Sequence, residues 1–549
     1  MRTRLILILI ILISGLVSPA QILTNNYYWI TLKDKTGTPF QLNKPEAFLS
    51  KRAIDRRIRQ AIPIDQTDLP VSPAYLDSLI KQGLTVIHSS KWLNGVTVGT
   101  PDTSLMKQIA KLPFVTSVKL TKPALQSKST ILKFNEEELK SAYNPSNYGI
   151  ALTQLTQLNG QYLHNLGYRG KGIQVAILDA GFWHVNQITA FDSLRNAGRI
   201  LGTRDFVDPT SDIYQQHTHG MSVLSCMGGN EPSVLLGTAP DASYYLFRSE
   251  DAATEYPIEE DNWVAAAELA DSLGVDVINS SLGYFLFDDP AMNHTYSDMN
   301  GTKSRVTQGA NMAFQKGILV FTSAGNEANN PWRHIISPSD GEDVIGVGAV
   351  DKNGVRASFS SIGPAYGGAV KPNVSAMGSL TFLITSAGTP GYSSGTSFSS
   401  PVLAGMGACL LQANPYSNVK LVKKAIEQSA SQYNNPDSLL GFGIPNFEKA
   451  DKYLKLYTAI PLLGKSSCSV SPNPFTDILT LRNLDPVSGG TCIISIYDLK
   501  SVCLWQSKVT VSETIQLNNI ANLPSGLLIL SIRYGKKEEH FKLIKTTHK

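Results

Sequence analysis

Apolar strand-like runs that alternate with helical stretches constrain the fold of residues 149–458 more than any other feature of this chain. The runs are, in order, IQVAILDA (173–180), SYYLFRS (243–249), WVAAAELADSLG (263–274), VDVINSS (275–281) and GILVFTSAG (317–325). The third has a helical pattern, and the others are typical of buried strands. The alternation therefore predicts one α/β domain, in which a parallel sheet lies between helices on both of its faces.

Residues 21–123 have a different pattern, that of a small α+β domain. YYWITLKD (27–34) alternates like a strand, FLSKRAIDRRIRQ (48–60) and AYLDSLIKQG (74–83) are helical, and three more strand-like runs follow. The first helix is strongly basic, with Lys51, Arg52, Arg56, Arg57 and Arg59. Such a helix can bind an acidic partner, but we prefer the simpler interpretation that its charges face the solvent.

Two polar segments separate the folded regions. Residues 124–148 lack sustained periodicity, so we predict an exposed linker there, and residues 459–467 form a second linker. Residues 468–549 contain several short strand-like runs, separated by turns rich in Asn, Pro and Gly. This spacing predicts a small β-sandwich at the end of the chain.

The first 20 residues have the pattern of a secretory signal peptide. Two positive charges in Met1–Arg4 precede 13 largely apolar residues, Leu5–Val17, and the small residues Ser18–Ala20 offer a cleavage site before Gln21. A membrane-spanning helix needs about 18 apolar residues, so this run is too short to be an anchor. No later segment qualifies, and we expect a secreted chain with no transmembrane segment after cleavage.

Composition excludes several classes of protein. Lys and Arg number 48 against 44 Asp and Glu in 549 residues, which is too balanced for a nucleic-acid-binding surface. Five cysteines without a CxxC pair exclude a disulfide scaffold and a zinc ribbon. We expect Cys226 and Cys409 to be buried free thiols, and a disulfide among Cys468, Cys492 and Cys503 stays open.

Four polar residues stand at the ends of predicted elements in the α/β domain. Asp179 ends one strand, Asn326 follows another, and His219 and Ser397 each precede or open a helix. The carboxyl ends of parallel strands lie at one edge of a sheet, where α/β folds place their sites. At such an edge an asparagine amide can donate to an oxyanion, and a helix N-terminus favours negative charge beside a serine.

Each of these residues also has a structural explanation when it is taken alone. An aspartate or asparagine after a strand is common in polar turns, and a serine that opens a helix is a common N-cap. His217 and His219 could instead bind a metal as an i, i+2 pair, but no third or fourth ligand is in view. It is the combination of all four that is specific.

That combination, in the order Asp, His, Asn, Ser, resembles the subtilases, the subtilisin-like serine peptidases, over about residues 149–458. Further similar segments are SLG (281–283), VIGVGAVDKNGVRASFSS (344–361) and KPNVSAMG (371–378). The resemblance implies a subtilisin-like sheet between helices and a secreted endopeptidase that hydrolyses peptide bonds through an acyl-enzyme on Ser397. Its general base is His219, oriented by Asp179, and Asn326 donates to the oxyanion.

The same resemblance implies a substrate-binding role for the strand Ser281, Leu282 and Gly283. The small residues Ser323, Ala324 and Gly325 permit a roomy primary pocket. Catalysis of this kind needs no cofactor and no metal ion, and the substrates are proteins or peptides. We expect the mature chain to be a monomer.

The chain also departs from the family pattern. Met221 stands where the family has threonine, the order His-Thr-His makes His217 a rival of His219, and Asn373–Gly378 varies a loop motif. We favour His219 because Gly220 and the start of a helix follow it. An apparent extra loop, residues 285–301, carries Asp288, Asp289 and Asp298, which could bind structural calcium; a solvated loop is the simpler interpretation.

Three other classes of function compete with a serine endopeptidase. A catalytically dead binding protein would lack a triad residue, and all are present. An α/β-hydrolase needs a GxSxG elbow and the order Ser, Asp, His, whereas here Ser397 comes last. A sedolisin-like acid peptidase would need Glu and Asp in place of His219 and Asn326.

The flanking regions extend the resemblance. Residues 21–123 resemble the inhibitory prodomain that many subtilases carry, so this prodomain is an expected partner of the enzyme. Residues 468–549, with Pro472–Phe475, Ile496–Asp498 and Gly526, resemble the C-terminal sorting domain of the type IX secretion system. This implies that the secretion machinery is a partner and that the chain reaches the medium or cell surface through the periplasm and outer membrane. A substrate- or glycan-binding module is the alternative.

Overall fold

The computed structural model describes residues 24–124, 131, 133–134, 138–140, 148–458, 468–482, 490–498, 502–512, 514–534 and 537–546. The predicted signal peptide, most of the predicted linker 124–148 and the whole of the linker 459–467 lie outside the described residues. Among the helices that are described, none is both long and apolar enough to cross a bilayer.

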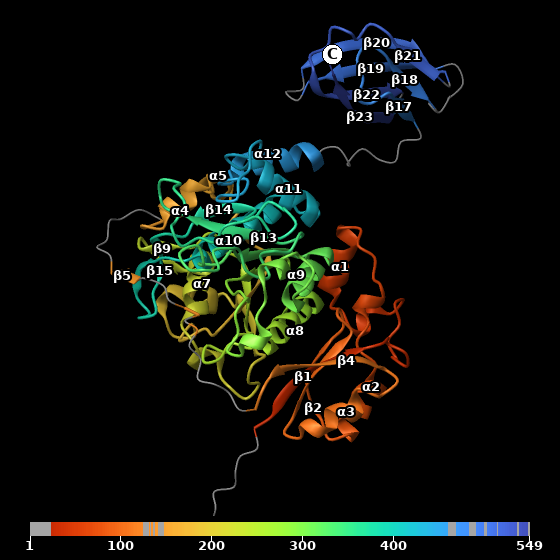
Figure 1. Cartoon of the computed structure of the whole chain (residues 1–549). Helices are drawn as coiled ribbons and strands as arrows, with labels where there is room; N and C mark the ends of the chain where they lie inside the picture. Colours follow the sequence, from red (N-terminus) through yellow and green to blue (C-terminus); the bar gives the residue numbers. More distant parts are fainter. Residues whose placement is uncertain are drawn as a thin grey trace, which may run out of the picture.

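Residues 24–124, here called the N-terminal domain, form a four-stranded antiparallel sheet in the order β2–β3–β1–β4 (Figure 1). Ile30, Val96 and Val98 of the sheet pack with Leu79 of α2 in a core of their own. The α+β prediction is confirmed. The elements are β1 (Asn26–Leu32), η1 (Pro45–Ala47), α1 (Lys51–Arg59), η2 (Gln66–Asp68), α2 (Pro73–Lys81), β2 (Thr85–Ser90), β3 (Gly95–Thr100), η3 (Thr103–Leu105), α3 (Met106–Ile109) and β4 (Val115–Lys122).

Residues 148–458, the central domain, are built on a seven-stranded sheet in the order β14–β13–β12–β11–β6–β10–β7, with every pair parallel. The strands are β6 (Gln174–Asp179), β7 (Ile200–Asp205), β10 (Ser243–Arg248), β11 (Val277–Ser280), β12 (Leu319–Ser323), β13 (Ile345–Val350) and β14 (Val374–Met377). Helices α7 and α10 pack together on the sheet, and α8 and α9 pack together on its other face (Figure 1). The predicted parallel sheet between helices is confirmed.

The helices of the central domain are α4 (Leu152–Gln157), α5 (Gln161–Asn165), α6 (Asp192–Asn196), α7 (His219–Gly228), α8 (Ile258–Leu273), α9 (Arg305–Gln315), α10 (Thr396–Ala413), α11 (Val419–Ser429) and α12 (Phe447–Thr458). The smaller elements are η4 (Thr189–Phe191), η5 (Ile213–Gln215), η6 (Pro290–Met292), η7 (Tyr296–Asp298), β8 (Asn230–Glu231), β9 (Leu235–Leu236), β15 (Thr381–Ile384) and β16 (Pro390–Ser393). One further strand, β5 (Glu138–Lys140), comes from the segment between the two domains and pairs with β16.

The strand order places a topological switch at β6. From β6 the chain builds the sheet toward β10 and β7, and it then returns to the other side of β6 with β11 and continues to β14. Ligands of open parallel sheets bind beyond the carboxyl ends of the strands at such a switch. Asp179 is the last residue of β6, so the fold puts it there.

Residues 468–546, the C-terminal domain, form two antiparallel sheets, β17–β18–β21 and β20–β19–β22–β23. Leu479 and Leu517 of the first sheet and Ile494 and Leu530 of the second belong to one apolar core, which is the arrangement of a β-sandwich. The strands are β17 (Ser469–Ser471), β18 (Leu479–Arg482), β19 (Thr491–Tyr497), β20 (Cys503–Thr510), β21 (Thr514–Leu517), β22 (Gly526–Tyr534) and β23 (Lys537–Lys545).

Helix α8 carries the interface between the N-terminal and central domains, since β1, β2 and α1 all contact it. It begins with three acidic residues, Glu259–Asp261, which suit the positive end of a helix dipole, and ends at Gly274, which has φ +88°. A side chain at Gly274 would meet the backbone of Ala53 in α1 at 2.7 Å, so this glycine also permits the close approach of α1.

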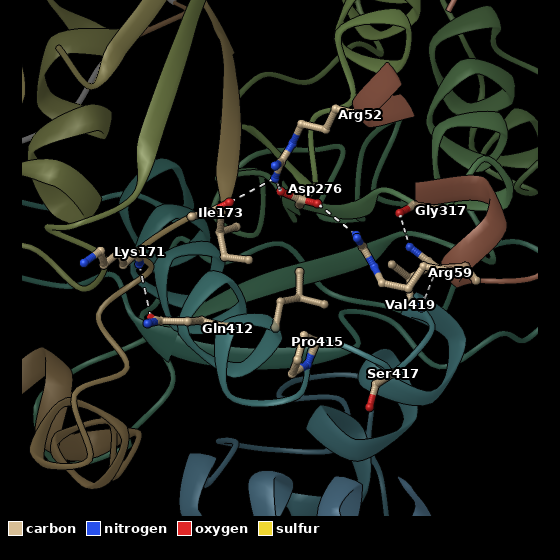
Figure 2. Close-up of a pocket in the computed structure, with 13 residues that line it drawn as sticks. Arg52, Arg59, Lys171, Ile173, Asp276, Gly317, Gln412, Pro415, Ser417 and Val419 are labelled. Carbon is tan, nitrogen blue, oxygen red and sulfur yellow. Dashed lines mark hydrogen bonds and ion pairs between the residues drawn. The ribbon is translucent and has the colours of Figure 1, made fainter. Parts of the chain in front are cut away.

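Two of the five basic residues of α1 are buried, and the expectation of a solvated face was wrong for these two. Arg56 and Arg57 are 0% and 1% exposed. Both pair with Asp271 of α8, at 2.5 and 2.7 Å. Arg52 and Arg59 converge on Asp276, beside a crevice of about 240 Å³ between α1 and the central domain (Figure 2). The acidic partner of this helix is therefore the chain's own central domain.

Candidate active site

Asp179 and His219 meet at the carboxyl edge of the sheet. The Asp179 Oδ1 and His219 Nδ1 atoms are 2.7 Å apart, and the two side chains are 0% and 1% exposed. Asp179 Oδ1 also accepts a hydrogen bond from the Ala180 N–H at 2.8 Å. The backbone N–H of His219 donates to His217 Nδ1 at 3.2 Å, so the two histidines are neighbours, and His219 is the one bonded to the carboxylate.

Two glycines allow this contact. A Cβ on Gly220 would lie 2.4 Å from the Gly181 carbonyl oxygen and 2.8 Å from Asp179 Cβ. A Cβ on Gly181 would lie 2.3 Å from the backbone nitrogen of His217. Gly181, which follows Asp179 and Ala180, and Gly220, which follows His219, are therefore both needed for strand β6 and helix α7 to approach so closely.

Ser397 is held at the N-terminus of α10 by a buried polar network. Its carbonyl oxygen accepts a hydrogen bond from Ser281 Oγ at 2.8 Å. Asn279 Nδ2 donates to Ser281 Oγ at 3.1 Å, and Ser400 Oγ donates to Asn279 Oδ1 at 2.8 Å. Sequence reasoning missed Asn279 and Ser400, although a polar asparagine inside the apolar run VDVINSS was a usable signal.

Asn326 is anchored through its amide oxygen. Oδ1 accepts hydrogen bonds from the backbone N–H and from the hydroxyl of Thr396, both at 2.9 Å. These two bonds fix the amide oxygen against the start of α10, so the NH₂ group is the end of the side chain that can still donate. Thr396 was also not foreseen as part of the site.

Ser397 and Asn326 line one cavity of about 430 Å³. Of the predicted substrate-binding residues, five line it: Ser281, Leu282, Gly283, Ser323 and Gly325. Ala324 does not, because it is fully buried in a small apolar cluster with Ile335 and Ala365.

Three described residues of the segment before the central domain, Ile131, Lys133 and Phe134, line this cleft. The ring of Phe134 is 4.4 Å from that of His219 and 4.6 Å from that of His217, measured between centroids. The expectation of an exposed linker therefore does not hold for these described residues.

Lys133 is bound by a cluster of three buried glutamates that the sequence did not reveal. Its Nζ lies 2.5 Å from Glu250, 2.9 Å from Glu255 and 2.9 Å from Glu259. Among the described residues, these three glutamates are the group of acidic, His and Cys side chains whose spacing could hold a metal ion. The ammonium group of Lys133 lies between them, where such an ion would bind. No local sequence motif indicates the cluster, because Glu250 and Glu255 lie in the loop before α8 and Glu259 lies in the first turn of α8.

The acidic residues of loop 285–301 accept hydrogen bonds from backbone and side chains of this chain. Asp289 accepts a hydrogen bond from the Ala291 N–H, and Asp298 accepts bonds from Thr295, so both cap short 3-10 helices. Asp288 accepts from the backbone N–H of Glu255. Calcium at this loop stays a prediction.

The five cysteines, all within the described residues, form no disulfide, and Cys226 and Cys409 are buried thiols as expected. Burial raises the pKa of the Cys409 thiol far above its usual value, so it is protonated and unreactive at neutral pH.

Three known families match this chain in succession. The Peptidase S8 propeptide domain of Bacteroidota matches residues 27–136, the subtilase family matches residues 170–443, and the secretion system C-terminal sorting domain matches residues 469–546. The second match spans all four residues of the Asp, His, Asn, Ser set.

Characterised relatives agree with these matches. Subtilisin NAT of Bacillus subtilis subsp. natto is 28% identical over 379 residues, which are 68% of this chain and 85% of that protein. Subtilisin DY of Bacillus licheniformis is 29% identical over 309 residues, 55% of this chain and 97% of that protein. The thermostable alkaline protease of Halalkalibacterium halodurans is 28% identical over 295 residues, 53% of this chain and 71% of that protein.

The matches account for the whole order of domains that the structure shows. The sorting domain marks the chain for secretion or for the cell surface. A propeptide domain ahead of the peptidase domain is the arrangement of a zymogen. The chain thus belongs to the subtilase family and is an exported serine-type endopeptidase.

Proposed function

We propose that Asp179, His219 and Ser397 form the catalytic triad of this endopeptidase. The observation that carries the proposal is the 2.7 Å contact of Asp179 Oδ1 with His219 Nδ1, beside a cavity that Ser397 lines. A carboxylate on Nδ1 stabilises the tautomer that leaves Nε2 free of a proton, so that Nε2 can accept one from a serine hydroxyl. Ser397 then attacks the substrate carbonyl and forms the acyl-enzyme.

Asn326 and the backbone N–H of Ser397 stabilise the oxyanion in this proposal. The fixed amide oxygen of Asn326 supports it, because an orientation set before the reaction costs nothing at the transition state. All of the groups invoked are side chains and backbone of this chain, and no step draws on a cofactor or metal ion. Structural calcium at loop 285–301 is a separate proposal, which a change of melting temperature on chelation would test.

Two substitutions test the triad. Ser397→Ala and His219→Ala should each reduce peptidase turnover by a factor on the order of 10⁶, the size of the loss known for subtilisin. His217→Ala should cost far less, because His217 is not the histidine bonded to Asp179. A fluorophosphonate probe should label the wild-type enzyme and not Ser397→Ala. Near-normal activity of His219→Ala would refute the assignment.

We further propose that the N-terminal domain is an inhibitory prodomain and that the enzyme cleaves itself between this domain and the central domain. Phe134 against His219 supports this, since it puts the connecting chain in the cleft. Ser397→Ala should accumulate as an unprocessed chain that retains residues 21–123. N-terminal sequencing of a fully processed mutant, from a host without other peptidases, would contradict self-cleavage.

The C-terminal domain is proposed to act as the address read by the outer-membrane secretion machinery, and removal of the domain after export is open. A chain that ends at residue 460 should keep its peptidase activity and stay in the periplasm of a host with a type IX system. Release of that shorter chain into the medium at the level of the full-length protein would contradict the proposal and favour a binding module.

A further inference from the structure

Three buried glutamates lie at one end of the cavity that contains Ser397. Glu250 and Glu255 line the cavity, and Glu259 reaches the same point from the first turn of α8. Their side chains are 4%, 5% and 1% exposed. Buried carboxylates are costly unless a cation or hydrogen-bond donors compensate them, so the position of this cluster at a peptidase cleft needs an explanation.

The ammonium group of Lys133 compensates the cluster in the unprocessed chain. Besides its three ion pairs, Lys133 Nζ donates to the carbonyl oxygen of Asp251 at 2.9 Å, and its side chain is 6% exposed. Burial alone would lower the pKa of Lys133, but the three glutamates outweigh burial and raise it well above the usual value. The lysine is therefore fully charged in the cluster.

The cluster has more carboxyl groups than Lys133 can neutralise. Glu250 also accepts from the Tyr284 hydroxyl at 2.9 Å, and Glu259 accepts from the backbone N–H of Asp251 and of Tyr256. Glu255 Oε1, by contrast, has no hydrogen-bond partner among the described residues, although it is buried. Burial raises the pKa of Glu255 to about 8, and Glu250 adds to the effect while Lys133 opposes it. A second cationic N–H donor, as a guanidinium would supply, could satisfy this oxygen.

Lys133 lies where a substrate residue would lie. Its neighbour Phe134 contacts His219, Ile131 lines the cavity, and β5 pairs with β16 a few residues further on. Ile131, Lys133 and Phe134 thus lie beside the proposed catalytic residues, where a bound substrate would lie. The departure of Lys133 after processing would leave three buried glutamates without their cation.

We propose that Glu250, Glu255 and Glu259 form a specificity subsite that takes the lysine or arginine side chain of a substrate, with Lys133 as its occupant before processing. This inference rests on the proposed peptidase function. The mature enzyme prefers substrates that carry a basic residue in the register that Lys133 has relative to Ser397. A divalent cation held by the emptied cluster is the competing outcome.

Peptides copied from the chain itself give the sharpest test. Internally quenched peptides with the sequence of residues 128–138 carry lysine, arginine or norleucine at the place of Lys133, and norleucine keeps the aliphatic stem while removing the charge. For the mature enzyme, kcat/KM should be about 30-fold or more higher for the lysine and arginine peptides than for the norleucine peptide. If a peptide resists cleavage, its affinity as a competitive inhibitor is compared instead. Glu255→Gln and Glu250→Gln should reduce that ratio, whereas Glu342→Gln, a matched change at an exposed position, should not.

The outcomes separate the two proposals. An enzyme that labels with fluorophosphonate and treats lysine and norleucine peptides alike overturns the subsite and leaves the triad intact. The subsite is likewise overturned if calcium raises the melting temperature through Glu255 and the enzyme has no lysine preference. An enzyme that neither labels nor cleaves any peptide overturns both proposals.

Discussion

Both ends of helix α8 pair with cations from the N-terminal part of the chain, but the ratio of cations to carboxyl groups differs between the two ends. At the carboxyl end, one aspartate, Asp271, pairs with Arg56, Arg57 and Lys91. At the amino end, Glu259 and its two partner glutamates share one lysine. Asp68 also pairs with Arg57 at the carboxyl end, so the cations there are compensated, whereas the amino end has more carboxyl groups than cations.

The pKa values follow this difference. Burial alone would raise the pKa of Asp271, but Lys91, Arg57 and Arg56 outweigh it and hold the pKa well below the usual range. Burial and neighbouring carboxylates raise the pKa of Glu259 well above its usual value in spite of Lys133. The carboxyl end is thus an ionic anchor for the N-terminal domain. The amino end is stabilised by a bound cation, and in the proposed subsite Lys133 is replaced there by a basic side chain of the substrate.

The largest effect is expected from breaking the anchor. In a Ser397→Ala chain, Asp271→Asn removes the carboxylate of the buried Arg56 and one of the two that pair with Arg57, which should cost about 3–5 kcal/mol of the free energy of opening at α1. Hydrogen–deuterium exchange of the α1 amides measures this free energy. If the substitution leaves the exchange of the α1 amides unchanged, apolar contacts alone hold the N-terminal domain against the central domain.

A smaller and pH-dependent effect is expected at the amino end. Lys133→Met, also in Ser397→Ala, removes the only cation seen in the described part of the cluster, and Glu255 and Glu259, whose pKa values are already raised, hold their protons more tightly. A carboxyl whose folded pKa is raised, as that of Glu255 is to about 8, contributes stability below its ordinary value of 4.5 that is lost as pH rises toward 8.

Lys133 opposes the raised pKa of Glu255, so its loss raises that pKa further. The cost of Lys133→Met should therefore be larger at pH 9.5 than at pH 6, by about 1–2 kcal/mol. Exchange of amides in β5 and α8 at the two pH values reports it. A cost that is equal at both pH values would mean that the loss of Lys133 does not raise the pKa of the glutamates, and it would weaken the contrast between the two ends.

Glu260 shows that the surplus of carboxyl groups does not extend along the first turn of α8. Burial would raise the pKa of Glu260, but His294 and Arg305 lower it to about 2, and Glu260 in turn raises the pKa of His294. The His294 contribution is complete below its ordinary value of 6.5 and is lost as pH rises through its higher folded value. The Glu260 contribution is complete above 4.5 and is lost as pH falls toward 2.

The pair should consequently be most stabilising between about pH 4.5 and 6.5. His294→Gln should cost about 1.5 kcal/mol at pH 5.5 and less at pH 9, measured by exchange in residues 285–301. A cost that increases with pH would reverse the assigned charges.

The smallest effect is expected from an exposed pair on the same helix as the anchor. Lys51 and Asp55 of α1 form an i, i+4 ion pair with side chains 87% and 48% exposed. Asp55→Asn should change the opening free energy of α1 by at most about 0.5 kcal/mol, because water screens the charges. This variant is the matched control for Asp271→Asn.

The residues of the proposed triad were recognisable from local sequence, and much of their surroundings was not. Asp179, His219 and Ser397 each stand next to a glycine or at an element boundary, so short segments identify them. Lys133 and the glutamates have no such signature, since their contacts join parts of the chain more than 110 residues apart. Polar composition suggested an exposed linker around Lys133, and partners that are distant in sequence bury it.

The sequence by itself determined the order of the three domains, the parallel sheet and the placement of Asp179, His219, Asn326 and Ser397 at element ends. Periodicity and glycine positions are local properties, and they decide where strands and helices begin and end. Only the tertiary structure decided that Arg56 and Arg57 are buried and that Lys133 enters the cleft. The reason is that the cost of burying a charge depends on whether a counter-charge meets it in space, and α8 brings those counter-charges to both ends of one helix.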